Sequence, residues 1–210
     1  MLDGLAYTLW RPDEEPWGGL VVIHGASSRK ENHHDFARAA RDAGLMVVVP
    51  DLRGHGESEG ALDGRVLDDL AAVAALLPDG LPLATRGSSM GGYLAIAGAE
   101  RLGARAVVAI CPASAEMLTR GLRDEEFEFA ADGPSLEAFL TAHPLQPPDI
   151  PLLLLHAEGD ERVPVEHSRE LAERAPQAKL VTVTGGHHRS VQHDPELQRL
   201  ALRWLQQALA

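Results

Sequence analysis

Short runs of consecutive apolar residues alternate along this chain with longer stretches in which apolar residues recur every three or four positions. This alternation is typical of βαβ units, which build a parallel sheet covered by helices on both faces. Strands buried on both faces are apolar at consecutive positions, as most of these runs are. The pattern therefore predicts an α/β fold with a doubly wound, mostly parallel sheet. The predicted strands span residues 20–23, 45–49, 82–85, 106–110, 152–156 and 180–183, with a possible edge strand at 5–10.

The segments between these strands carry the spacing of amphipathic helices. The clearest is the last one, where Asp194 is suited to cap the first turn and Pro195 suits the first helical position. Its apolar residues repeat at helical spacing from Leu197 to Ala208, so this stripe should pack on the sheet. The predicted helices span residues 34–43, 66–77, 90–101, 165–175 and 195–208.

One segment, residues 113–148, interrupts the alternation and ends in a proline-rich stretch. A stretch of this length between two strands is more often a lid or a loop excursion than a separate domain. A chain of 210 residues forms one well-buried core and is short for two domains. We expect a single domain over residues 1–210, with a cap-like excursion at about 113–148. Its phenylalanines, Phe127, Phe129 and Phe139, would either line an acyl pocket or pack inside the cap.

Composition narrows the class of protein. Hydrophobic residues make up 45% of the chain and charged residues 24%, which indicates an ordinary globular protein. The formal charge of -12 would repel phosphate backbones and anionic lipids, so we expect neither nucleic acid nor a membrane as a partner. Cys111 is the only cysteine, which excludes an internal disulfide and a thiolate zinc cluster. Residues 1–4 lack the pattern of a signal peptide, and a cytoplasmic location fits best.

The strongest chemical signal is the G-x-S-x-G motif at residues 87–91, which follows an apolar run and opens a helical segment. In that context the serine, Ser89, sits on a sharp turn, and the flanking glycines let strand and helix approach closely. Small residues can also make a tight turn without any chemistry. The position between a strand and a helix favours a nucleophile.

A serine hydroxyl needs a base to take its proton and a carboxylate to orient that base. Asp160 follows the predicted strand 152–156, and Glu158 is a weaker alternative at the strand end. His187 follows the predicted strand 180–183, with His188 as its rival. Because loops at the carboxyl ends of parallel strands converge on one edge of a sheet, these groups can meet there.

The order serine, acid, histidine resembles that of the α/β-hydrolase superfamily, and the likeness covers nearly the whole chain. Within that family the chain resembles the dienelactone hydrolase and serine aminopeptidase-like branch. The family's usual Gly-x-His pattern favours His187 over His188 as the base. The sequence at 24–26 resembles the family's oxyanion loop, which implies an oxyanion hole made by the backbone N–H groups of Ala26 and Met90. The N–H of Ser27 is an alternative to that of Ala26.

The segment 51–58 resembles another loop of this family, one that is structural and contributes no catalytic group.

The resemblance implies a cofactor-independent serine hydrolase that cleaves a small-molecule ester or thioester through an acyl-enzyme on Ser89. A serine at the elbow disfavours the dehalogenases and epoxide hydrolases of this fold, which use an aspartate there. The alternatives are a peptidase and a protein that keeps the fold for binding or as a scaffold.

No cofactor and no metal are expected, because the ten histidines show no H-E-x-x-H spacing. The histidines at 33, 34, 55 and 143 are interpreted as polar surface or loop residues.

Overall fold

The computed structural model describes all 210 residues and contains one seven-stranded sheet with the order β1-β3-β2-β4-β5-β6-β7. The edge strand β1 pairs antiparallel with β3, and every other neighbouring pair is parallel. The predicted α/β architecture is therefore confirmed. The strands are β1 Tyr7–Trp10, β2 Gly18–Ile23, β3 Leu45–Pro50, β4 Leu83–Ser88, β5 Ala104–Ile110, β6 Leu152–Ala157 and β7 Ala178–Val183.

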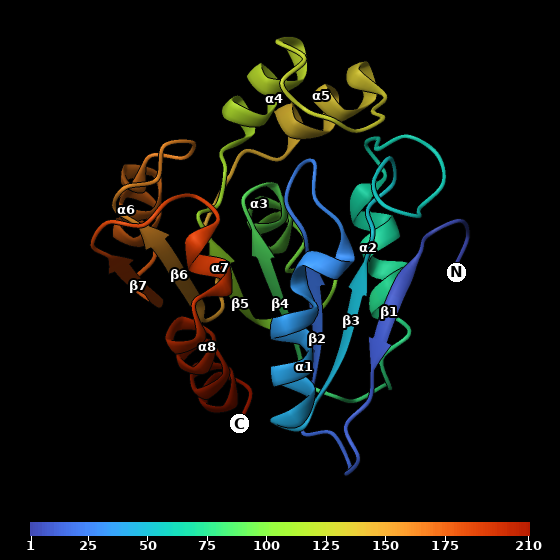
Figure 1. Cartoon of the computed structure of the whole chain (residues 1–210), viewed down its shortest axis with the longest axis vertical. Helices are drawn as coiled ribbons and strands as arrows, with labels where there is room; N and C mark the ends of the chain where they lie inside the picture. Colours follow the sequence, from blue (N-terminus) through green and yellow to red (C-terminus); the bar gives the residue numbers. More distant parts are fainter.

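Helices cover both faces of the sheet, so its inner strands are buried from both sides. Helices α1 and α8 pack on one face, while α2, α3 and α6 pack on the other (Figure 1). Each face has its own cluster of buried apolar side chains. The bounds are η1 Lys30–His33, α1 His34–Asp42, α2 Val66–Ala74, α3 Met90–Ala97, α4 Ala115–Arg123, α5 Gly133–Ala142, α6 Val165–Glu173, α7 Ser190–His193 and α8 Pro195–Ala208.

The sequence placed the strands and the helices that pack on the sheet correctly, but it did not predict helices α4 and α5 within residues 113–148. Helix α8 has the predicted bounds, and Asp194 caps it by accepting the N–H groups of Glu196 and Leu197. Helices α2 and α3 end three and four residues earlier than expected. The helical turns η1 and α7 were not predicted, because four residues are too few to show helical periodicity.

Residues 113–148 leave the sheet after β5 and return to it at β6, and they hold the helix pair α4 and α5. The pair lies beyond the carboxyl ends of the strands (Figure 1). Both helices begin at a side-chain cap, where Ser114 accepts the N–H of Met117 and Asp132 accepts the N–H of Ser135. We call residues 113–148 the cap.

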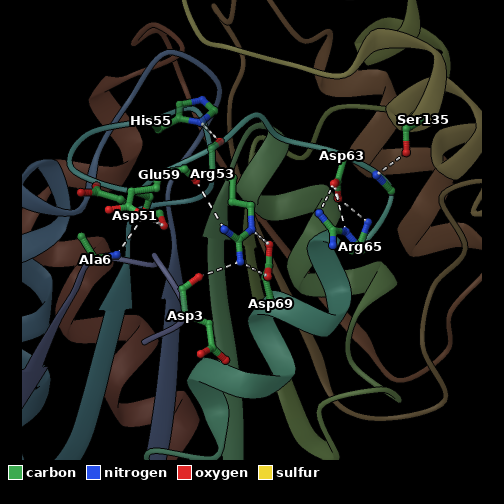
Figure 2. A network of polar contacts seen from close by, with 12 residues as sticks. Asp3, Ala6, Asp51, Arg53, His55, Glu59, Asp63, Arg65, Asp69 and Ser135 are labelled. Atoms are coloured by element: carbon green, nitrogen blue, oxygen red, sulfur yellow. Dashed lines mark hydrogen bonds and ion pairs between the residues drawn. The ribbon is translucent and has the colours of Figure 1, made fainter. Parts of the chain in front are cut away.

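The loop between β3 and α2 is fixed by polar contacts (Figure 2). The guanidinium of Arg53 donates to both carboxylate oxygens of Asp69, at 2.8 and 3.0 Å, and to the main-chain oxygen of Asp3 at 3.1 Å. Asp63 binds Arg65 in a second ion pair of the same loop. These contacts join residues of the loop to one another, to helix α2 and to the amino-terminal segment.

None of the helices in the structure is both long and apolar enough to cross a bilayer.

Candidate active site

Ser89 lies on the turn between β4 and α3, with backbone angles of φ 57° and ψ -119°. A non-glycine residue with positive φ is strained, so the surrounding structure must hold this turn. A Cβ atom at Gly87 would lie 1.9 Å from the carbonyl oxygen of Gly91, and one at Gly91 would lie 2.2 Å from that of Ile23. The two glycines of the motif are therefore required by close backbone contacts.

Asp160 follows β6 and accepts three hydrogen bonds, with a second histidine at a longer distance. Its Oδ1 accepts the N–H groups of Arg162 and Val163, both at 2.9 Å. Its Oδ2 lies 2.7 Å from Nδ1 of His188 and 3.4 Å from Nε2 of His156. Burial alone would raise the pKa of Asp160, but the contacts with the two histidines and the two N–H groups outweigh it and hold the pKa well below its usual range. Asp160 is thus a carboxylate at neutral pH.

The partner of Asp160 is His188, and the prediction of His187 is corrected. Because Asp160 is ionised, Nδ1 of His188 donates to it, which leaves Nε2 as the nitrogen free to accept a proton. The side chain of His187 is exposed, and its Nδ1 accepts the N–H of Arg189 at 3.4 Å. The alternative acid, Glu158, accepts a hydrogen bond from Thr182 and lies outside the cavity that contains Ser89.

The Gly-x-His pattern failed here because it fits the chain in two registers. Gly185 and His187 satisfy it, and so do Gly186 and His188. Both glycines have positive φ, of 73° and 74°, and the hydroxyl of Ser190 accepts the N–H of His187 and donates to its carbonyl. This turn keeps His187 outside and brings His188 to Asp160. Nothing local in the sequence distinguishes the two registers.

The oxyanion loop after β2 is oriented by His24, a fully buried side chain. The N–H of Leu52 donates to Nε2 of His24 at 2.9 Å, so the ring carries its proton on Nδ1 and donates it to the carbonyl of Gly25 at 2.8 Å. Burial, with a smaller contribution from His55, lowers the pKa of His24 to about 4 and keeps the ring neutral. Since the Gly25–Ala26 peptide is trans, fixing that carbonyl also fixes the direction of the Ala26 N–H.

The far end of the oxyanion loop is anchored by Lys30. Its main-chain N–H and its ammonium donate to the two oxygens of Asp51, at 2.7 and 2.8 Å, and the ammonium also binds Glu57 at 2.6 Å. Burial works against the charge of Lys30, but these carboxylates raise its pKa above the usual range. The segment 51–58 therefore supports the oxyanion loop through this ion cluster.

Backbone N–H groups are available at the positions predicted for the oxyanion hole. The N–H of Ala26 has no hydrogen-bond acceptor in the chain, and neither has that of Ser27. Met90 is the first residue of α3, a position whose N–H has no partner inside the helix. Ser27 has φ 54°, and its hydroxyl accepts the N–H of Glu128 from the cap at 2.8 Å.

Ser89, His188 and the N–H-bearing residues Ala26 and Ser27 line one cavity of about 500 Å³. Ser89, His188 and the oxyanion loop line it from the sheet side, and the cap lines it from above. This volume suits a small organic molecule. Its charged lining comes from the cap, from the loop after β6 and from the loop before α7, and includes Arg120, Glu126, Glu128, Glu161, Arg162 and Arg189.

A second, closed region under the cap is lined by apolar side chains alone. Phe127, Phe129 and Phe139 all lie in it, next to Met90. Its free volume is only about 10 Å³, so the three rings are packed. Phe127 also lines the open cavity, and it stacks on Phe129 with ring centroids 5.5 Å apart. Phe129 and Phe139 therefore pack inside the cap, whereas Phe127 both packs there and lines the open cavity.

Cys111 lies behind the Asp160–His188 pair, with its sulfur within 4.8 Å of ligand atoms on both. Burial, and then the charge of Asp160, raise the pKa of this thiol above its usual range, so it is protonated at neutral pH. Oδ1 of Asp160 already accepts two N–H groups, and its Oδ2 accepts Nδ1 of His188. We therefore interpret Cys111 as a small apolar residue of the core.

Several histidines are more buried than the sequence suggested. His33 and His55 are only 1% and 4% exposed. The prediction of a surface or loop residue is wrong for His33, which is buried in η1, whereas His55 lies in a loop as predicted but is buried there. His55 lies between His24 and Phe129, with ring centroids 4.8 and 4.2 Å away. His156, at the end of β6, was not considered as a site residue, although it contacts Asp160. The sequence pattern of β6 does not single out His156, because this strand is buried on both faces and shows no alternation of apolar and polar positions.

The chain shares sequence with known hydrolases. It is 36% identical over 101 residues to a monoacylglycerol lipase of Mycolicibacterium smegmatis, a match that covers 44% of this chain and 36% of the lipase. It is 37% identical over 103 residues to the human monoglyceride lipase, covering 45% of this chain and 34% of the relative. The chain thus aligns with about a third of the length of these relatives.

Solved structures share the fold. The esterase Est1E of Butyrivibrio proteoclasticus, with ferulic acid bound, superposes with a TM-score of 0.83 at 22% identity and covers 99% of this chain and 97% of its own. A monoacylglycerol lipase of Paleococcus ferrophilus gives a TM-score of 0.74 at 22% identity, covering 97% of this chain and 99% of its own.

Two family models match the sequence in succession. The model described as serine aminopeptidase, S33, matches residues 14–123, which hold the oxyanion loop and the nucleophile turn. The model described as TAP-like protein matches residues 137–208, which hold Asp160 and His188. Since the first match alone spans more than half of the chain, the protein belongs to the serine aminopeptidase S33 family of α/β-hydrolases.

Proposed function

We propose that this protein is a serine hydrolase that cleaves a carboxylic ester or thioester of a small molecule, with Ser89 as nucleophile, His188 as general base and Asp160 as the orienting acid. The observation that carries the proposal is the 2.7 Å contact between Asp160 and His188, beside the cavity that also holds Ser89 on its strained turn. The names of the relatives, two of them lipases of acylglycerols, support an ester as substrate.

The mechanism follows from the proton positions. Nδ1 of His188 donates to Asp160, so Nε2 takes the hydroxyl proton of Ser89 as the oxygen attacks the ester carbonyl. The carbonyl oxygen becomes negative, and the N–H groups of Ala26 and Met90 donate to it. Two donors of this kind lower the barrier by about 3 kcal/mol each. Asp160 stabilises the imidazolium that forms, because its carboxylate stays ionised.

The second half repeats the first with water. His188 returns its proton to the alcohol or thiol as its bond to the acyl carbon breaks. The alcohol or thiol leaves, and the acyl group stays on Ser89. Water then enters the open cavity, gives a proton to His188 and attacks the acyl carbon. His188 then returns this proton to the oxygen of Ser89 as the carboxylic acid leaves. The oxyanion hole is used in both halves of the reaction, and no cofactor takes part.

The test is hydrolysis of p-nitrophenyl acetate and butyrate, together with labelling by a fluorophosphonate. We expect turnover by the wild-type protein and a loss of about three or more orders of magnitude in Ser89→Ala. The label should be carried by Ser89 alone. Ester hydrolysis that survives in Ser89→Ala would disprove the nucleophile assignment.

An aminoacyl anilide assay tests the peptidase alternative. Cleavage of such anilides without cleavage of esters would overturn the ester proposal while leaving Ser89 as nucleophile. A wild-type protein that binds an ester without cleaving it would support the binding or scaffold alternative instead.

A further inference from the structure

Arg86 is the largest fully buried side chain of the protein, with 1% of its surface exposed. It lies on β4, three residues before Ser89. No carboxylate lies within 4 Å of its guanidinium, and its Nε has no hydrogen-bond partner. Burial lowers the pKa of Arg86 to about 10, so the group still carries a positive charge at neutral pH. Asp35 attracts this charge but forms no ion pair with it, and a buried charge without an ion-pair partner lowers the stability of a fold, which calls for an explanation.

The contacts of Arg86 reach the two elements that flank the site. Its Nη2 donates to the main-chain carbonyl of Gln192 in α7 at 3.1 Å, and its Nη1 lies 3.4 Å from Nδ1 of His33 in η1. Burial, and then the charge of Arg86, lower the pKa of His33, so that ring is neutral and accepts through Nδ1. The guanidinium also lies 3.9 Å from the ring centroid of Phe36. Arg86 thus joins the nucleophile strand to the helical turn after the oxyanion loop and to α7.

Helix α7 is continuous with the turn that carries His188. The hydroxyl of Ser190, the first residue of α7, accepts the main-chain N–H of His187 at 3.0 Å and donates to the main-chain carbonyl of His187 at 2.8 Å. The carbonyl of Gln192 accepts a second hydrogen bond, from the side chain of Gln198 in α8, at 3.0 Å. The position of α7 therefore sets where the His188 ring enters the cavity.

We propose that Arg86 is a positioning residue: it ties α7, and with it the base His188, to the strand that ends at the nucleophile. This inference rests on the proposed role of His188. A methionine would fill a similar volume without a charge, so what the arginine contributes is its directed hydrogen bond to α7. Displacing a catalytic group by about 1 Å can slow a reaction about 100-fold.

The test is Arg86→Met, with stability and kinetics measured on the same preparation. We expect thermal stability equal to or above that of the wild type, because the buried charge is gone. We expect kcat for p-nitrophenyl butyrate to fall about 100-fold while KM stays within about threefold. The downfield proton resonance of the His188–Asp160 hydrogen bond should weaken or shift. A folded Arg86→Met protein with wild-type kcat and an unchanged resonance would overturn the inference.

Two further variants keep the outcome interpretable. Arg105→Met removes an exposed arginine from the neighbouring strand β5 and should change nothing. Gln198→Leu removes the second donor to the Gln192 carbonyl, together with a hydrogen bond to Asp35 at 2.9 Å, and should lower kcat about tenfold, with the same change in the resonance. If Arg86→Met does not fold, wild-type kcat in Gln198→Leu decides against the inference. A fully active His188→Ala protein would instead refute the proposed function, on which the inference depends.

Discussion

The proposed nucleophile, Ser89, and the proposed base, His188, are held in place in different ways. Ser89 is positioned by close contacts between backbone segments, because a Cβ atom at Gly87 would clash with Gly91 and one at Gly91 would clash with Ile23. His188 is positioned by contacts distant in sequence, with Asp160 lying 28 residues before it and with α7 tied to Arg86, 106 residues before Gln192. A position fixed by contacts between backbone atoms is insensitive to most side-chain substitutions elsewhere in the chain. A position fixed by distant polar contacts can be lost through one substitution far from the chemistry.

The pair of adjacent histidines gives the largest expected effect. His188→Ala should lower kcat about 1,000-fold or more, because it removes the proposed base that takes the proton of Ser89. His187→Ala should leave kcat within about threefold, since that ring is exposed and does not contact Asp160. The measurement is steady-state hydrolysis of p-nitrophenyl butyrate by both variants.

The two alanine variants serve as each other's control, because they remove the same side chain from neighbouring positions. The opposite pattern, an inactive His187→Ala beside an active His188→Ala, would restore the interpretation made from the sequence. Equal losses would mean that the turn, rather than one ring, is what matters.

The steric side of the comparison is tested at Gly91. A methyl group there would lie 2.2 Å from the carbonyl oxygen of Ile23 and 2.5 Å from that of His24, both of which belong to the backbone. We expect Gly91→Ala to lower the free energy of unfolding by about 3 kcal/mol or more, as severe overpacking does. Urea denaturation followed by circular dichroism measures this change.

Gly133→Ala is the matched control, because a Cβ atom at Gly133 meets nothing within 4 Å. This position begins α5, where alanine is the better helix former, so we expect a gain of about 0.5 kcal/mol. If Gly91→Ala proved as stable as Gly133→Ala, the turn at Ser89 would have more freedom than its contacts allow.

The same distinction explains what could be predicted from the sequence. The turn at Ser89, the strands and the helices that pack on the sheet depend on local pattern, and they were found where expected, whereas α4 and α5 were not predicted. Asp160 was found because it follows an apolar strand. The choice between His187 and His188 depends on the path of a glycine turn that Ser190 and α7 complete, and both registers fit the same motif. The buried Arg86 resembles any charged residue in sequence, and only its surroundings reveal its contacts.

A smaller effect is expected on the pH dependence of stability, because the buried ring of His24 must stay neutral in the folded protein. Its pKa is about 4 in the folded protein and about 6.5 when exposed, so between these values the unfolded chain binds the extra proton. Stability contributed by the neutral ring is present above pH 6.5 and is lost as the pH falls toward 4. The loss attributable to His24 is roughly 3 kcal/mol. Urea denaturation at a series of pH values measures it.

His24→Phe isolates this contribution, because it keeps a buried ring that cannot titrate, while His33 stays in both proteins. We expect a shallower fall in stability between pH 6.5 and 4 for the variant, even though it starts from a lower value. Parallel curves for the two proteins would show that His24 does not supply this pH dependence.

The smallest expected effect comes from the link between the oxyanion loop and the cap. The hydroxyl of Ser27 accepts the N–H of Glu128, and Ser27→Ala removes that acceptor at a cost of about 1 kcal/mol. Because Ser27 adjoins the N–H of Ala26, we expect the loss to appear in kcat, as a fall of roughly fivefold, with KM nearly unchanged. Thr141→Ala is the control, since that hydroxyl donates only to Glu137 within its own helix. A fall in stability without a fall in kcat would mean that the contact between the cap and the oxyanion loop stabilises the fold but does not position the oxyanion hole. A fall in kcat would mean that the cap helps to position the N–H groups of the oxyanion hole.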